Sequence, residues 1–141
     1  MAKLIQKTIS KPCHPKFLNE VRALLSETLT AALIPQRDKD LIVLAVDEAV
    51  SSVVHYARFK GLQNEITVSV DIDDVRFKAR IEDSLNVFDF AGGLSDTQLA
   101  ERVAREKGYT MGIFLIRQIM DEISYVYRKG FQNELELIKF L

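Results

Sequence analysis

A long apolar helix with a carboxylate in its middle constrains this chain more than any other feature. Over residues 38–58, apolar side chains recur at spacings of three and four and cover most sides of the predicted helix. Such a helix belongs in the centre of a fold. Glu48 lies halfway along it, and a carboxylate there is costly to bury unless it is paired or functional. The apolar residues are Leu41, Leu44, Ala45, Val46, Ala49, Val50, Val53 and Val54.

The other periodic segments predict an α/β sandwich, with a mixed, mainly antiparallel sheet and helices on one of its faces. The 48% hydrophobic content of the 141 residues is ample for one core, so residues 1–141 are expected to form a single domain. In chain order we predict an edge strand ending at Lys11-Pro12, helices over 15–32 and 38–58, strands over 65–71 and 75–82, an irregular connection over 83–107 with a polar helix over 97–106, a helix over 111–120, and strands over 123–128 and 134–140.

Charge and targeting signals exclude several classes of function. The 19 basic and 20 acidic residues nearly cancel, which gives no field that would draw the chain to nucleic acid or to a membrane. The N-terminal segment contains Lys3 and Lys7 and is not a secretory signal, and no apolar stretch is long enough to span a bilayer. We therefore expect a cytoplasmic protein.

The single cysteine, Cys13, excludes an intramolecular disulfide and fits a reducing compartment. His14 follows it directly, so the pair could be a reactive couple or half of a metal site. Two adjacent ligands without further partners seldom hold a metal, and an incidental thiol is the favoured interpretation.

Three polar side chains project together from the long helix. Helical periodicity places Glu48, Ser52 and His55 on one stripe, so a carboxylate, a hydroxyl and an imidazole can face one cavity. Two alternatives remain open for the hydroxyl, because serines inside helices often bond back to the backbone. For His55 we favour a core histidine that bonds a backbone carbonyl, and not a metal ligand.

The segment "LAVDEAVSSVVHYA", residues 44–57, resembles the second-helix motif of the anti-sigma-factor serine kinases. That resemblance implies a Bergerat-type, histidine-kinase-like ATPase fold that binds ATP or ADP with Mg²⁺. It also implies a catalytic role for Glu48 in orienting or deprotonating the attacking group. The family's Mg²⁺-binding asparagine falls on Ser52, which becomes the candidate metal and nucleotide contact, with a shorter reach than an amide.

A second segment, "IEDSLNVFDF" at residues 81–90, resembles the family's adenine-side loop. Asp83, Phe88 and Asp89 align, and the resemblance implies that Asp83 accepts a hydrogen bond from the adenine amino group. An ordinary strand-end turn residue remains the alternative for Asp83. Leu85 and Val87 stand where the family has glycines, and β-branched Val87 resists the positive φ that glycine allows.

The segment "GYTMGIFLIRQIMDEISY", residues 108–125, resembles the glycine-rich lid that leads into a helix and a strand. Gly108 and Gly112 are the candidate nucleotide contacts, since glycines beside a helix N-terminus can bring backbone amides to phosphates. A turn at Gly108 and a close helix contact at Gly112 are the alternatives. In the final "NELELIKFL", Asn133 stands where the family often has threonine.

Two functions follow from the resemblance, and the residues at positions 52, 85 and 87 favour the first of them. The favoured hypothesis is a partner-switching regulator that binds an anti-sigma antagonist or a sigma-type factor, with ATP binding weakened or lost. The alternative is an active ATP-dependent serine/threonine kinase that phosphorylates the antagonist. A sensor histidine kinase is disfavoured because the dimerisation helix and the phospho-acceptor region are absent. The resemblance also allows a homodimer.

Overall fold

The computed structural model describes residues 4–59, 65–83, 95, 97–98, 100–101, 109–126 and 133–141. Within these ranges the predicted strands and the helices over 15–32, 38–58 and 111–120 are present, with ends shifted by a few residues. The elements in chain order are β1 (Ile5–Pro12), α1 (Lys16–Ala31), α2 (Gln36–Phe59), β2 (Glu65–Ile72), β3 (Arg76–Asp83), α4 (Tyr109–Ile119), β4 (Glu122–Val126) and β5 (Asn133–Phe140).

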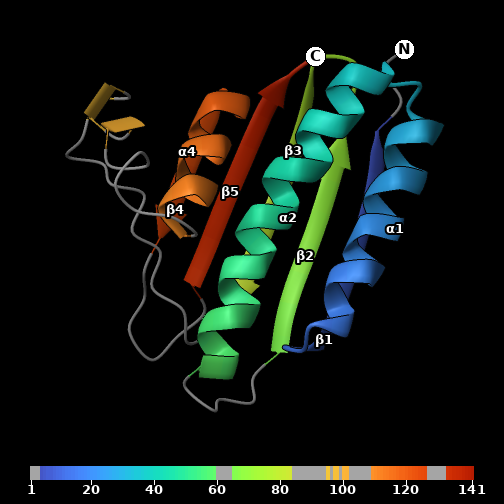
Figure 1. Cartoon of the computed structure of the whole chain (residues 1–141). Coiled ribbons are helices and arrows are strands. Elements are labelled where there is room, and N and C mark those ends of the chain that lie inside the picture. The colour runs from blue at the N-terminus through green and yellow to red at the C-terminus, as the bar shows by residue number, and fades with distance from the viewer. Residues whose placement is uncertain are drawn as a thin grey trace.

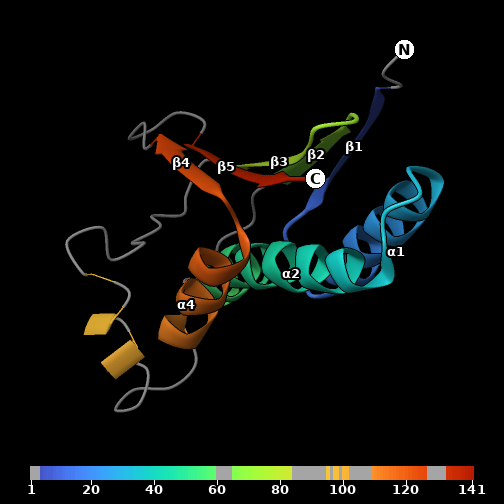
Figure 2. The same cartoon turned by 90° about the horizontal axis from the view of Figure 1, so that it is seen from above.

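The five strands form one sheet in the order β1-β2-β3-β5-β4, and each of these four pairings is antiparallel. β1 lies at an edge, as predicted. Helices α1, α2 and α4 lie on one face of the sheet, which Figure 1 shows from the helix side. Figure 2, seen from above, shows the strands and the helices as two layers. The predicted fold class is confirmed, and the described sheet is antiparallel throughout.

Alternation along β2 and β3 separates an inner face from an outer one. In both strands every second residue is buried beneath the helices, from Ile66 to Ile72 and from Phe77 to Asp83. The turn between them is acidic, as expected of a hairpin. Asp73 Oδ1 accepts hydrogen bonds from the backbone N–H of Val75 (2.8 Å) and of Arg76 (2.9 Å), and these bonds lower the pKa of Asp73.

The outer face of the sheet is polar and carries cross-strand pairs. Arg80 Nε lies 3.0 Å from Glu134 Oε1, and Lys78 Nζ lies 3.7 Å from Glu136 Oε2. Thr8 donates to Ser69 Oγ at 3.3 Å. This face therefore needs no helical cover, which leaves the single core between the sheet and the helices. No helix in the described part of the chain is long and apolar enough to cross a membrane.

The turn after α1 places a leucine in an unusual backbone conformation. The N–H of Ile34 bonds to the carbonyl of Leu29 (3.1 Å) and the N–H of Leu33 to that of Thr30 (3.0 Å), the two bonds of a Schellman motif. Leu33 occupies its left-handed position at φ 60°, where glycine is usual, and its side chain is 88% exposed. α1 buries Phe17, Val21, Leu25, Thr28 and Leu29 beneath it.

Helix α2 forms the centre of the helical layer, with α1 packed on one flank and α4 on the other. Most of its predicted apolar residues are buried, among them Ala45, Val46, Ala49 and Val50. Leu44 is an exception at 39% exposure. Beyond the sheet, Ser95 and Gln98 exchange the reciprocal bonds of a capping box, at the start expected for the polar helix over 97–106, which otherwise lies largely outside the described residues.

Candidate functional site

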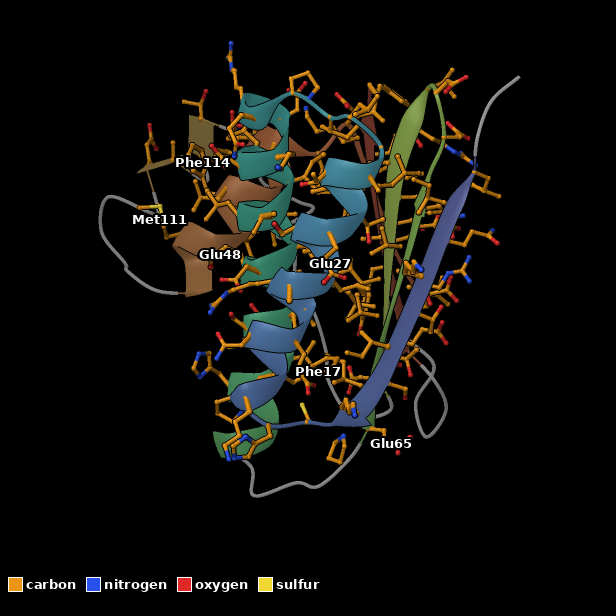
Figure 3. All side chains as sticks on the ribbon, turned by 90° about the vertical axis from the view of Figure 1, so that its right-hand side faces the viewer. Phe17, Glu27, Glu48, Glu65, Met111 and Phe114 are labelled. Carbon is orange, nitrogen blue, oxygen red and sulfur yellow. The ribbon has the colours of Figure 1, made fainter. Side chains whose placement is uncertain are left out.

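Glu48 lies at the seam between α2 and α4. Its side chain is half-buried, and Figure 3 shows it between the two helices. Across the seam is Gly112, where a Cβ atom would lie 2.7 Å from Glu48 Oε2. The carboxylate predicted to be functional is thus held against a neighbouring helix and does not extend freely into solvent.

Burial is the main influence on the Glu48 carboxyl. It raises the pKa of Glu48 because the charged form loses solvation, and the negative charge of Asp47 raises it further. Asp47 itself is paired: Arg22 Nε lies 2.7 Å from its Oδ1, and Arg22 also donates from its second amino group to Oδ2 at 3.1 Å. A raised pKa makes the carboxylate a stronger base than a fully solvated glutamate, which is a property that a general base uses.

Ser52 bonds to its own helix. Its Oγ donates to the backbone carbonyl of Glu48 at 2.9 Å, so of the two alternatives for this hydroxyl the back-bonded one is observed. The lone pairs of Oγ remain, but a single short hydroxyl does not make a Mg²⁺ site. No group of three His, Cys, Asp or Glu side chains within the described ranges could hold a metal ion. At the position where the resemblance puts the metal-binding asparagine, the structure therefore offers one hydroxyl that is bonded to the helix backbone.

The prediction for His55 was wrong. Its side chain is exposed, whereas a core histidine was expected. The helical period is not at fault, because residue 55 lies seven positions after Glu48 and only about 20° from it around the helix. The stripe predicted from sequence therefore holds, but it is half-buried at Glu48 and Ser52 and exposed at His55.

Asp83 is the last residue of β3 and is 2% exposed. An ordinary turn aspartate would face water, so the burial of Asp83 disfavours the strand-end interpretation. Opposite it in the register, Asn133 opens β5 and is equally buried. Sequence reasoning did not include Asn133 among the site residues. The available signal was a polar residue at the inner position of an alternating apolar strand.

Cys13 follows β1 and lies close to this sheet end. Its thiol is 3.9 Å from the Val53 carbonyl, and burial, with a smaller contribution from the charge of Asp83, raises the pKa of Cys13 to about 11. The neighbouring His14 accepts a bond from the backbone N–H of Lys16 through Nδ1. The two side chains therefore have separate partners, which agrees with an incidental thiol.

Several residues named in the sequence analysis lie outside the described ranges: the candidate contact Gly108, the aligned Phe88 and Asp89, and the glycine replacements Leu85 and Val87. Gly112 is described, and it lies buried within α4, packed on Glu48 as the close-contact alternative proposed.

A groove of about 610 Å³ lies on the α1 side of α2. None of the predicted site residues lines it, so it is separate from the candidate site. Its walls are formed by Arg22, Ser26, Gln36, Lys39, Asp40, Val43, Leu44 and Asp47.

Comparison with known proteins agrees with this geometry. Serine-protein kinase RsbW of Listeria innocua is 27% identical over 127 residues, which cover 87% of this chain and 80% of that protein. RsbW of Staphylococcus epidermidis is 28% identical over 137 residues, covering 92% of this chain and 83% of the relative. These relatives confirm the resemblance to the anti-sigma-factor serine kinases.

A solved structure shares the fold. A chain from the crystal structure of the SiaB-SiaC complex of Pseudomonas aeruginosa superposes with a TM-score of 0.72 at 14% identity, covering 94% of this chain and 88% of that one. The family described as histidine kinase-like ATPase domain matches residues 12–139. Because this match spans nearly the whole chain, the protein belongs to the family of histidine kinase-like ATPase domains.

Proposed function

We propose that this chain is a partner-switching regulator of the anti-sigma type whose handling of Mg²⁺-triphosphate is weakened or lost. Its relatives are serine-protein kinases, and the Pseudomonas neighbour was solved in a two-protein complex. The proposed partner is an anti-sigma antagonist or a sigma-type factor. The near-neutral charge gives no reason to add nucleic acid or membrane as a target.

The observation that carries the proposal is the bond from Ser52 Oγ to the Glu48 carbonyl at 2.9 Å. The resemblance puts a metal-binding asparagine at this position, and here a short hydroxyl is turned to the helix backbone. Phosphoryl transfer depends on positioning and on neutralising phosphate charge, so losing the metal ligand affects the chemistry more than it affects adenine recognition.

The residues proposed to contact adenine retain more of the expected chemistry than position 52 does. Asp83 and Asn133 place a carboxylate and an amide side by side at the buried end of the sheet. A carboxylate can accept from an exocyclic amino group, and an amide can both donate and accept. We therefore expect any nucleotide affinity that remains to depend on the adenine and little on Mg²⁺ or the γ-phosphate.

Calorimetric titration with ADP and ATP, each with and without Mg²⁺, tests the proposal. The expected result is weak or absent binding that Mg²⁺ does not improve. Ser52→Asn should then introduce Mg²⁺ dependence, while the matched control Ser51→Asn, one residue away on the same helix, should not. Micromolar, Mg²⁺-dependent ATP binding by the unmodified protein would contradict the proposal.

One observation favours the alternative, an active serine/threonine kinase. Burial raises the pKa of Glu48, as a general base requires. In that reaction the bond between the γ-phosphorus of ATP and the β–γ bridging oxygen breaks, and ADP leaves. The γ-phosphoryl group bonds to the hydroxyl oxygen of the partner, and the hydroxyl proton passes to Glu48. Labelled phosphate transfer to a partner protein that Glu48→Gln abolishes, and Glu27→Gln does not, would establish this alternative in place of the weakened site.

A further inference from the structure

Gly112 is required to be small for steric reasons, and not because of its backbone conformation. It sits within the helix Tyr109–Ile119, is buried, and its φ lies outside the left-handed range. Any residue could adopt this backbone. A Cβ atom there would lie 2.7 Å from Oε2, 3.7 Å from Cδ and 3.8 Å from Cβ of Glu48, and these are its three nearest neighbours. What a side chain at 112 would meet is therefore Glu48.

A glycine inside a helix is unfavourable relative to alanine, because it loses more conformational freedom on folding. At Gly112 the missing Cβ atom leaves space that the Glu48 side chain fills. The atom in closest conflict, Glu48 Oε2, is the far end of a flexible side chain. A methyl group at 112 would consequently displace the carboxylate and leave the two helices in place.

The charges around Glu48 are few among the described residues. Asp47 acts on it from α2, and Arg22 of α1 pairs with Asp47. Among the described side chains of α4, residues 111–119, the titratable one is Arg117, which lies about 140° around the helix from Gly112. Contact with Gly112 is thus a packing influence on the Glu48 carboxyl, and not an ion pair.

We propose that Gly112 is a positioning residue that seats the Glu48 carboxylate against α4. This differs from a backbone contact to phosphate, which a glycine in a lid would make. The inference rests on the proposed function only for what Glu48 does once seated. Because Gly112 is the fourth residue of α4, the seat also makes the position of Glu48 depend on the placement of the first turn of α4.

The test is Gly112→Ala, read without nucleotide or partner. With glutamate labelled at the side-chain carboxyl carbon, the titration midpoint of Glu48 is followed by NMR, using Glu48→Gln to assign the signal. The expected result is a midpoint that moves down toward the ordinary value, because the methyl group pushes the carboxyl into water. The urea midpoint of unfolding should be unchanged or higher, because alanine favours the helix.

Two further variants keep the test decisive. Gln118→Ala, an exposed position on the same helix, should leave the Glu48 midpoint where it is. In a Glu48→Ala background, Gly112→Ala should raise the urea midpoint more than it does beside Glu48, since nothing then opposes the methyl group. An unmoved Glu48 midpoint, or equal gains in both backgrounds, would overturn the proposal. Nucleotide binding enters none of these readouts, so the proposed function can fail separately.

Discussion

Asp83 and Asn133 are register partners at the ends of β3 and β5, and each side chain is 2% exposed. Both take part in polar interactions. A buried carboxylate and a buried amide are costly unless hydrogen-bonded, so two of them on the inner face mark the sheet end as a polar spot beneath an apolar layer. This end is the proposed site of adenine recognition.

Asp83→Asn should lower the affinity for ADP at least tenfold, about 1.4 kcal/mol or more. The replacement keeps the shape of the side chain but can present an amide donor to the donor on the nucleotide, which leaves a buried group unpaired. Fluorescent-ADP titration measures the effect. Glu82→Gln, one residue earlier on the outer face, is the control and should bind as the unmodified protein does. Equal affinities in all three proteins would remove Asp83 from the nucleotide site.

The Cys13 thiol should react slowly with disulfide reagents. Its pKa is about 11 against an ordinary 9.0, so at pH 8 thiolate is on the order of a hundredfold scarcer than for a free thiol. Asp83→Asn removes the smaller of the two causes and should quicken the reaction several-fold. The rate of thiol–disulfide exchange is measured from the absorbance of the thiolate that an aromatic disulfide reagent releases, at pH values from 7 to 9. A rate equal to that of a cysteine peptide would contradict the burial argument.

Periodicity was sufficient to predict most of the elements and the covering of one face of the sheet by helices, but not the strand order, and the sheet expected to be mixed is antiparallel in its described pairings. Alternation in β2 and β3 and the three-and-four spacing in α1 are local signals, and each was confirmed within a few residues. The failure at His55 was one of burial and not of direction. Periodicity places His55 on the same stripe as Glu48, but it does not say how far along the helix other elements cover that stripe.

The site was less predictable, because its key relationships join distant segments. The pairing of Asp83 with Asn133 depends on the register of β3 with β5, fifty residues apart in the chain. The contact of Gly112 with Glu48 depends on how α4 packs on α2. A glycine beside a helix start has the same appearance in sequence whether it binds phosphate or admits a neighbour's side chain, and only the packing separates the two.

Glu48→Gln should stabilise the fold at neutral pH but not in acid. Because the folded-state pKa of Glu48 is raised, the folded protein keeps a proton that the unfolded chain releases as pH rises above the ordinary value of 4.5. Stability therefore falls through that window and is level above the folded pKa. Glutamine does not ionise, so the Glu48→Gln protein does not lose stability in this pH window. Solvent screening of the half-buried carboxyl limits the gain at pH 7 to about 1 kcal/mol or less.

Urea unfolding at pH 4 and at pH 7 checks the sign. The difference between Glu48→Gln and the unmodified protein should be present at pH 7 and shrink toward pH 4, and the exposed Glu27→Gln should show no such trend. A gain that is the same at both pH values would mean that packing, and not ionisation, is responsible.

Replacing leucine by glycine should raise the stability of the fold at Leu33 and lower it at Leu44. The left-handed backbone of Leu33, φ 60°, crowds the Cβ atom, and its 88% exposed side chain recovers little from packing. Leu33→Gly should therefore raise the free energy of unfolding by about 0.5–1 kcal/mol, a gain that remains after the greater freedom of glycine in the unfolded chain has offset part of the relief.

Leu44 is also exposed but lies in the middle of α2, so Leu44→Gly should lower the free energy of unfolding by about 1 kcal/mol or more. Urea denaturation of both variants measures the pair. A loss of stability at both positions would show that the Leu33 side chain contributes more to the fold than its exposure indicates.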